Sequence, residues 1–188
     1  MHTRTTLLAL AWAPLALIPS RGTDLPAQNL PVYGGSGGSS YSRSCGADRV
    51  LTGFRYRSGL VIDAIGLLCR PVNSDGTLGA ETTVGTLAGG GGGTAGSTSC
   101  SRGKVVTGAS IRFNSYAEQV MYFCRDWIPS TRTFGASSTE ESKVTGGSSN
   151  RFTQIISERC ELSAQPAHGI RGREASVVDA IGLVCDEP

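Results

Sequence analysis

The chain of 188 residues carries 17 lysine and arginine residues against 15 aspartate and glutamate residues, with six cysteines and 26 glycines. Two of the basic residues, Arg4 and Arg21, lie in residues 1–22, which contain no acidic residue, so the rest of the chain balances 15 against 15. A neutral chain gives no reason to expect nucleic acid or an anionic membrane as a partner. The remaining length of about 160 residues suffices for one domain with a core.

The first 22 residues have the pattern of a secretory signal peptide. Arg4 precedes an apolar run at residues 7–18, and small residues follow at the positions expected before a cleavage site. The run is short and contains proline, which disfavours a transmembrane helix and membrane insertion. We therefore expect a secreted, extracellular protein whose cysteines form disulfides. Residues 23–32, with their prolines and polar side chains, are expected to form a flexible leader with little structure.

Residues 33–188 are expected to form one domain of three repeats, at 33–72, 89–127 and 146–188. Each repeat has a glycine-rich stretch, an opening cysteine, two apolar segments around a turn, and a closing cysteine. The two cysteines of each repeat are separated by 24, 24 and 25 residues. Six cysteines allow 15 pairings, and this constant spacing favours the three local ones. The expected disulfides are Cys45–Cys69, Cys100–Cys124 and Cys160–Cys185.

Alternation of apolar residues predicts β-strands in the repeats. The residues expected to share one face are Val61, Asp63, Ile65, Leu67 and Cys69 in the first repeat, and Val177, Asp179, Ile181, Leu183 and Cys185 in the third. Turns are placed midway between the cysteines, at 57–59 and 172–174. This symmetry predicts that each pair of cysteines faces across the two strands of a hairpin.

An acidic residue stands six positions before each closing cysteine: Asp63, Glu118 and Asp179. Three hairpin units are compatible with blades around an axis, turns of a solenoid, or three sheets closed into a prism, and the pattern alone leaves these alternatives open. A prism would place the three acidic residues at one edge of the molecule, related by a pseudo-threefold axis.

Two segments resemble a known family. The sequence YGGSGG at residues 33–38 and GREASVVDAIGLV at 172–184 are similar to the opening and closing segments of the jacalin-related lectins. The first repeat carries the closing pattern again as YRSGLVIDAIG, at residues 56–66. The cysteine-bracketed repeats resemble the vitelline membrane outer layer proteins. Typical jacalin-related lectins lack these cysteine pairs. Either resemblance implies an all-β fold, a β-prism of three Greek-key sheets related by a pseudo-threefold axis, which the expected disulfides would staple.

The resemblance to the lectins implies a sugar site in which an aspartate and the backbone N–H groups of a Gly-x-x-x-Asp loop hold a monosaccharide beneath the glycine-rich loop. A carboxylate accepts sugar hydroxyls, and glycine lets the backbone come close to a ligand. The candidate residues are Gly59, Leu60, Val61 and Asp63 in the first repeat, Ala175, Ser176, Val177 and Asp179 in the third, and Gly34, Gly35, Gly37 and Gly38 in the glycine-rich loop.

The three loops match this motif to different degrees. Residues 59–63 carry both glycine and aspartate, whereas the third loop has Ala175 in place of the glycine. The second loop, at 114–118, has neither residue, and its glutamate would reach into the space of a sugar. Each aspartate has an alternative role as a cap of its own turn.

The other features of the sequence do not indicate a metal site, a cofactor or a catalytic site. The glycine run at 89–93 is typical of a flexible hairpin tip. Trp127 is the aromatic residue in the most loop-like context, and His168 is the only histidine after residue 22. With one histidine and paired cysteines, we expect no metal site, no cofactor and no catalytic triad.

The sequence therefore predicts a secreted protein that binds a mono- or oligosaccharide or a glycoconjugate without catalysis. It is compatible with either a monomer or an oligomer. A structural extracellular matrix or coat protein on the same scaffold is the first alternative. A hydrolase or an enzyme inhibitor is the second, because one fold supports many functions.

Overall fold

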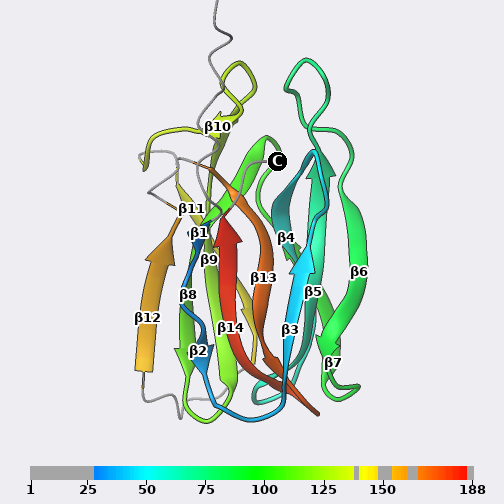
Figure 1. Cartoon of the computed structure of the whole chain (residues 1–188), viewed down its shortest axis with the longest axis vertical. Helices are drawn as coiled ribbons and strands as arrows, with labels where there is room; N and C mark the ends of the chain where they lie inside the picture. Colours follow the sequence, from blue (N-terminus) through cyan, green and yellow to red (C-terminus); the bar gives the residue numbers. More distant parts are fainter. Residues whose placement is uncertain (1–27, 138–139, 148–153, 161–164, 186–188) are drawn as a thin grey trace, which may run out of the picture.

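The structure is a computed structural model that describes residues 28–137, 140–147, 154–160 and 165–185. The predicted signal peptide at 1–22 lies outside these residues. The described chain consists mainly of β-strands, which form three sheets that surround one core (Figure 1). The same residues include no helix that is long and apolar enough to cross a membrane.

Each sheet is built around one hairpin. The first-repeat sheet has the order β6-β5-β4-β7 and contains β4 (Arg49–Ser58), β5 (Ile62–Pro71), β6 (Thr82–Gly89) and β7 (Thr94–Ser99). The second-repeat sheet has the order β10-β9-β8-β12, with β11 also paired to β9. Its strands are β8 (Lys104–Phe113), β9 (Ala117–Ile128), β10 (Thr133–Phe134), β11 (Glu141–Gly146) and β12 (Gln154–Arg159).

The third sheet joins the two ends of the chain, and we call it the closing sheet. It has the order β1-β14-β13-β3, with β2 also paired to β14. Its strands are β1 (Gln28–Asn29), β2 (Tyr33–Gly34), β3 (Ser39–Ser44), β13 (Ala167–Glu174) and β14 (Val178–Cys185). In every sheet the hairpin lies in the middle, and a strand that is distant in the chain returns beside its first strand. This is the Greek-key order, so the three sheets have the predicted architecture.

All three sheets contribute to one apolar core. Phe54 of β4 and Tyr122 of β9 meet edge to face, with their ring centroids 5.0 Å apart. The closing sheet adds Ile170 and Ile181, which are fully buried in the same cluster. The predicted strand face is confirmed for its last three positions in both repeats, because those residues all lie in this core: Ile65, Leu67, Cys69, Ile181, Leu183 and Cys185.

The prediction of a flexible leader at 23–32 is wrong for its described part, residues 28–32. Gln28 and Asn29 form β1 and pair with Cys185 and Val184 of β14. Leu30 is 3% exposed and belongs to the core. The proline-rich composition misled the prediction, because the exposed edge of β14 supplies backbone partners that the segment cannot provide for itself.

The three disulfides form between the predicted cysteines, with Cα atoms 5.8, 5.7 and 5.5 Å apart. They do not cross a hairpin, as the sequence analysis expected. Each opening cysteine directly follows the outer strand of one sheet: β3, β7 or β12. Each closing cysteine lies in a central strand of the next sheet, β5, β9 or β14. The disulfides therefore link the three sheets to one another in a ring.

The hairpin turns also differ from the prediction. In the first repeat the turn lies at residues 59–61, which overlaps the predicted 57–59. In the third it lies at 175–177, three residues after the predicted turn, because Arg173 and Glu174 continue β13 and pair with Ala180 and Val178. The β8–β9 and β13–β14 turns lie together at the lower end of Figure 1.

Candidate functional site

The three acidic residues occupy equivalent positions in the three sheets. Asp63, Glu118 and Asp179 are each the second residue of the strand that follows a hairpin turn. Each turn is closed by the same backbone hydrogen bond, from the N–H of its first residue to the carbonyl oxygen two residues later. The N···O distances are 3.1 Å from Gly59, 3.2 Å from Asn114 and 3.0 Å from Ala175.

Each acidic residue is paired with a glycine-rich loop from another repeat. The carbonyl oxygen of Asp179 accepts a hydrogen bond from the N–H of Gly35 at 2.9 Å. The equivalent bonds run from Gly90 to Asp63 and from Gly147 to Glu118, both at 2.8 Å. The glycine loop of each repeat therefore closes over the acidic residue of the repeat before it, and the first loop closes over the last acidic residue.

Each glycine loop also touches the hairpin turn of the remaining repeat. A Cβ atom at Gly35 would lie 2.0 Å from the carbonyl oxygen of Ser115, and one at Gly90 would lie 2.2 Å from that of Ser176. The equivalent contact joins Gly147 to Leu60, also at 2.2 Å. The three turns and three loops thus form a ring at one end of the molecule, and this places the acidic residues at a common edge, as the prism predicts.

Gly34–Gly38 and Gly89–Gly93 are equivalent loops, which the sequence analysis did not recognise. Gly38 and Gly93 both have φ of 63°. A Cβ atom at either glycine would lie within 2.6 Å of a carboxylate oxygen, of Asp179 in one case and of Asp63 in the other. The run at 89–93 is therefore packed against Asp63 rather than being a free hairpin tip. Both loops need glycine because the carboxylate occupies the space of a side chain.

The alanine in the third loop is compatible with the turn. The only described residues other than glycine with a positive φ are Asp48 and Arg132. Ala175 therefore has an ordinary backbone conformation, and its N–H closes the turn as Gly59 does. The departure from the Gly-x-x-x-Asp motif leaves the geometry of this loop intact.

A pocket of about 310 Å³ opens beside Asp179. It is lined by Gly35, Ser36, Gly37, Ser115, Tyr116 and Asp179. The pocket thus combines the first glycine loop with the turn of the second repeat, and Tyr116 stands at its edge with 44% of its surface exposed.

Asp179 is only 4% exposed, and the Oδ2 atom of its carboxylate has no hydrogen-bond partner. Within the described part of the chain, neither this carboxylate nor that of Asp63 accepts a hydrogen bond from its own turn, so their geometry does not fit the alternative role of turn caps. A buried acceptor without a partner is costly, which favours an incoming donor. Glu118 is also buried, at 6%, and its Oε2 likewise has no partner.

Two arginines that the sequence analysis did not consider hold the glycine loops in place. The guanidinium of Arg173 donates to the carbonyl oxygens of Gly37 and Gly38 at 2.7 and 2.6 Å. Arg57 donates to Gly92 and Gly93 at 2.6 and 2.8 Å. A signal was present in the sequence, since an arginine stands six residues before each of the three acidic residues. These paired donations fix the carbonyl oxygens of both glycine loops.

The remaining predicted residues are placed differently. Leu60 is 73% exposed, and its carbonyl faces Gly147 in the loop over Glu118 rather than the loop over Asp63. Ser176 likewise faces Gly90 rather than the pocket of Asp179. Val61 and Val177 are half-buried and supply the carbonyl oxygens that close their turns.

Trp127 and His168 have structural roles. Trp127 is 7% exposed, and its indole N–H donates to the carbonyl oxygen of Gly76 at 2.7 Å. It lies near the end of β9, away from the turns. The two ring nitrogens of His168 lie 2.7 Å from Ser44 Oγ and 3.0 Å from the carbonyl oxygen of Arg49.

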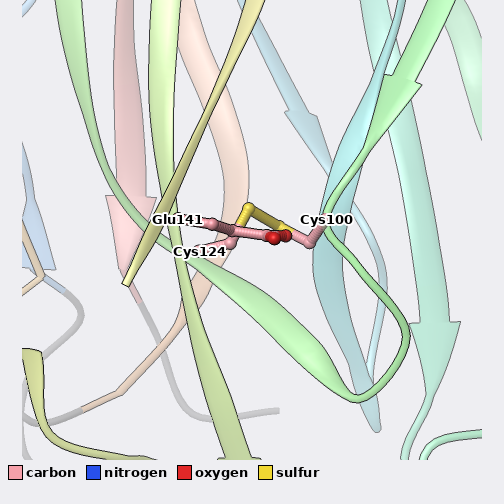
Figure 2. A group of neighbouring side chains, drawn as sticks. All are labelled: Cys100, Cys124 and Glu141. Atoms are coloured by element: carbon pink, nitrogen blue, oxygen red, sulfur yellow. A yellow bond between two sulfur atoms is a disulfide. The ribbon is translucent and has the colours of Figure 1, made fainter. Parts of the chain in front are cut away.

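Cys100, Cys124 and Glu141 form a compact group that resembles a metal site in composition (Figure 2). The two sulfur atoms are joined in a disulfide, so they offer no thiolate ligand. The carboxylate of Glu141 accepts hydrogen bonds from the backbone N–H and the hydroxyl of Ser101. Burial raises the pKa of Glu141, but these hydrogen bonds and the charges of Lys143 and Lys104 together outweigh it and hold the pKa below its usual value.

The fold and this ring define a β-prism with its acidic loops at one end. Comparison with solved structures finds the same fold in Malaysian banana lectin, with a TM-score of 0.58 and 18% identity over 86% of this chain and 99% of that chain. A mannose-binding jacalin-related lectin from Ananas comosus matches with a TM-score of 0.57 and 18% identity, over 86% and 99%. The Calystegia sepium agglutinin matches at 0.56 and 17% identity, over 89% and 99%.

These structures confirm the resemblance to jacalin-related lectins at the level of the fold. No protein-family model matches the sequence, and no curated protein matches it either. The resemblance to vitelline membrane outer layer proteins stays a prediction.

Proposed function

We propose that this protein is a secreted carbohydrate-binding protein without catalytic activity, and that its main sugar site is the pocket beside Asp179. The observation that carries the proposal is the buried Oδ2 atom of Asp179, an acceptor without a partner beside a pocket of about 310 Å³. The pocket has the size of a small-ligand site, at the lower end of the usual range.

A monosaccharide satisfies the chemistry of this pocket. Its hydroxyls donate to the carboxylate of Asp179, and the N–H groups of the glycine loop donate to its oxygens. The exposed ring of Tyr116 offers a surface for the C–H face of a sugar. The likeness to lectins supports this assignment, because the Ananas comosus protein is mannose-binding and the Calystegia sepium lectin was solved with a biantennary N-glycan.

Asp63 provides a second site of the same kind. It has the equivalent glycine loop, the equivalent arginine and a half-buried carboxylate. No aromatic residue stands where Tyr116 stands at the first site, because the equivalent turn residue of the third repeat is Val177. We therefore expect the Asp63 site to bind the same sugars more weakly.

A glycan array followed by calorimetric titration with the best ligand tests the proposal. Asp179→Asn removes the charge at nearly constant volume, and Glu118→Gln is the matched control in the loop of the second repeat. A hydrogen bond to a charged group contributes about 1.5–3 kcal/mol, so Asp179→Asn should lower affinity about ten- to a hundredfold. Glu118→Gln should leave the affinity unchanged.

Two outcomes would contradict the proposal. If no glycan binds, or if the Asp63→Asn, Asp179→Asn double variant retains full affinity, a structural coat or matrix role on the same scaffold takes its place. Turnover of model glycosides would instead support the hydrolase alternative. Secretion is tested separately, by recovering the protein from the medium and sequencing its N-terminus, which we expect at Thr23.

A further inference from the structure

A second and larger pocket lies at the other end of the molecule. Its volume is about 590 Å³, and it is lined by Arg70, Thr77, Leu78, Gly79, Ala80, Arg102, Gly103, Trp127 and Pro129. Arg70 and Trp127 stand near the far ends of β5 and β9, which begin at the acidic loops. At about 3.3 Å per residue, the two pockets are separated by on the order of 25 Å.

The pocket is built from fixed parts. The loop that follows β5 is held to β9 by the hydrogen bond from the indole N–H of Trp127 to Gly76, and a Cβ atom at Gly76 would lie 2.1 Å from the carbonyl oxygen of Pro129. The loop also closes on itself, through Asn73 N–H to Thr77 oxygen at 2.9 Å. The pocket walls therefore exist before any ligand arrives. The loops that carry them project at the upper end of Figure 1.

The polar part of the pocket is positively charged. In the described part of the chain, the exposed guanidinium of Arg102 makes no hydrogen bond or ion pair. Arg70 donates one hydrogen bond to Gly79 at 3.0 Å, and its Nε atom lies 3.9 Å from Glu81. Glu81 already accepts hydrogen bonds from two hydroxyl groups, and the nearby Asp75 carboxylate is engaged by Thr77. Arg102 thus contributes an uncompensated positive charge beside an apolar wall of Leu78, Trp127 and Pro129.

We propose that this pocket is a second binding site, specific for a sugar that carries a carboxylate or sulfate group. A guanidinium group binds either anion through paired N–H donors. The apolar wall suits the C–H face of a pyranose ring. A volume of about 590 Å³ fits one or two sugar rings. The proposal does not rest on the Asp179 site, so each can fail alone.

Titration of the full chain with acidic sugars tests the proposal. Glucuronic acid and galactose 6-sulfate are compared with glucose, galactose and inorganic sulfate, by calorimetry and by tryptophan fluorescence. Trp127 lines the pocket, and it is the one tryptophan that follows the predicted cleavage site in the sequence. We expect each acidic sugar to bind at least tenfold more tightly than its neutral parent, and binding to weaken as salt is raised. The stronger of the two acidic sugars identifies the anion.

Variants locate the site. Arg102→Gln should lower the affinity for acidic sugars about ten- to a hundredfold without changing the melting temperature, since the side chain is exposed and makes no contact that holds the fold. Arg55→Gln removes one positive charge from the first-repeat sheet, where the guanidinium donates to the carbonyl oxygen of Gly85, and should have no effect. Equal affinity for neutral and acidic sugars, or unchanged binding in Arg102→Gln, would overturn the proposal. So would inorganic sulfate, or a short glutamate peptide, that binds as tightly as the sugars.

Discussion

Removal of one disulfide tests the way in which the sheets are joined. In the Cys160→Ala, Cys185→Ala variant, the lost bond closes 25 residues and links the residue after β12 to the last residue of β14. The chain-entropy model assigns about 3.5 kcal/mol at 25 °C to a loop of this length. For a domain of this size, that loss should lower the melting temperature by about 7–14 °C in a circular dichroism melt.

Hydrogen exchange distinguishes a bond between sheets from a bond within a hairpin. We expect amide protection to fall in both β12 and β14, because Cys160 N–H donates to Thr107 in the second-repeat sheet while Cys185 lies in the closing sheet. The Cys100→Ala, Cys124→Ala variant loses a bond that closes a loop of similar length, so it should show an equal loss of stability, centred on β7 and β9. A loss below about 1 kcal/mol, or protection lost only in β13 and β14, would refute the ring of linked sheets.

Three further predictions concern single residues. Leu30→Ala should lower the free energy of unfolding in urea by about 2–5 kcal/mol. An unchanged free energy would instead support the prediction of a flexible leader. Burial raises the pKa of Glu140, but two arginines outweigh it and hold the pKa below 4.5. The stability that these ion pairs contribute is complete above pH 4.5, and it is lost as the pH falls through the lower pKa of Glu140 in the folded protein. Glu140→Gln should therefore make the free energy of unfolding depend less on pH on the acid side. Gly37→Ala places a Cβ atom 2.5 Å from Asp179 and should weaken sugar binding about tenfold, whereas Gly91→Ala, with open space around it, should not.

The fold class and the cysteine pairing were accessible from the sequence because both are repeated. A spacing that recurs three times constrains the topology more than any one segment does, and local pairing is the simplest way to repeat a bond. The hairpin interpretation was wrong because the symmetric position of two cysteines in sequence does not place them on the same two strands. Cys45 ends the β3–β13 pairing, where its N–H donates to His168, so its partner lies in another sheet.

The candidate site was predictable only in part, for a related reason. Asp179 and the loop at 34–38 are at opposite ends of the chain, and the resemblance to lectins brought them together. No such pattern joined the glycine run at 89–93 to Asp63, so its composition suggested a flexible tip. Arg57 and Arg173 were missed because an exposed arginine is common on strands, and their loop contacts are not encoded locally.

The ring explains why the first glycine loop serves the last acidic residue. Each loop closes over the repeat before it, so the first loop has no earlier repeat in the chain and closes over the third instead. The closing sheet supplies the geometry, because β1 and β2 pair with β14 and bring residues 34–38 to Asp179. The pocket beside Asp179 therefore forms only when both ends of the chain are in place, and its closure carries the entropic cost of joining distant segments. The disulfide at Cys185 lies directly opposite Gln28 in this pairing, so the bond that links the last two sheets also fixes the strand on which the N-terminal segment docks.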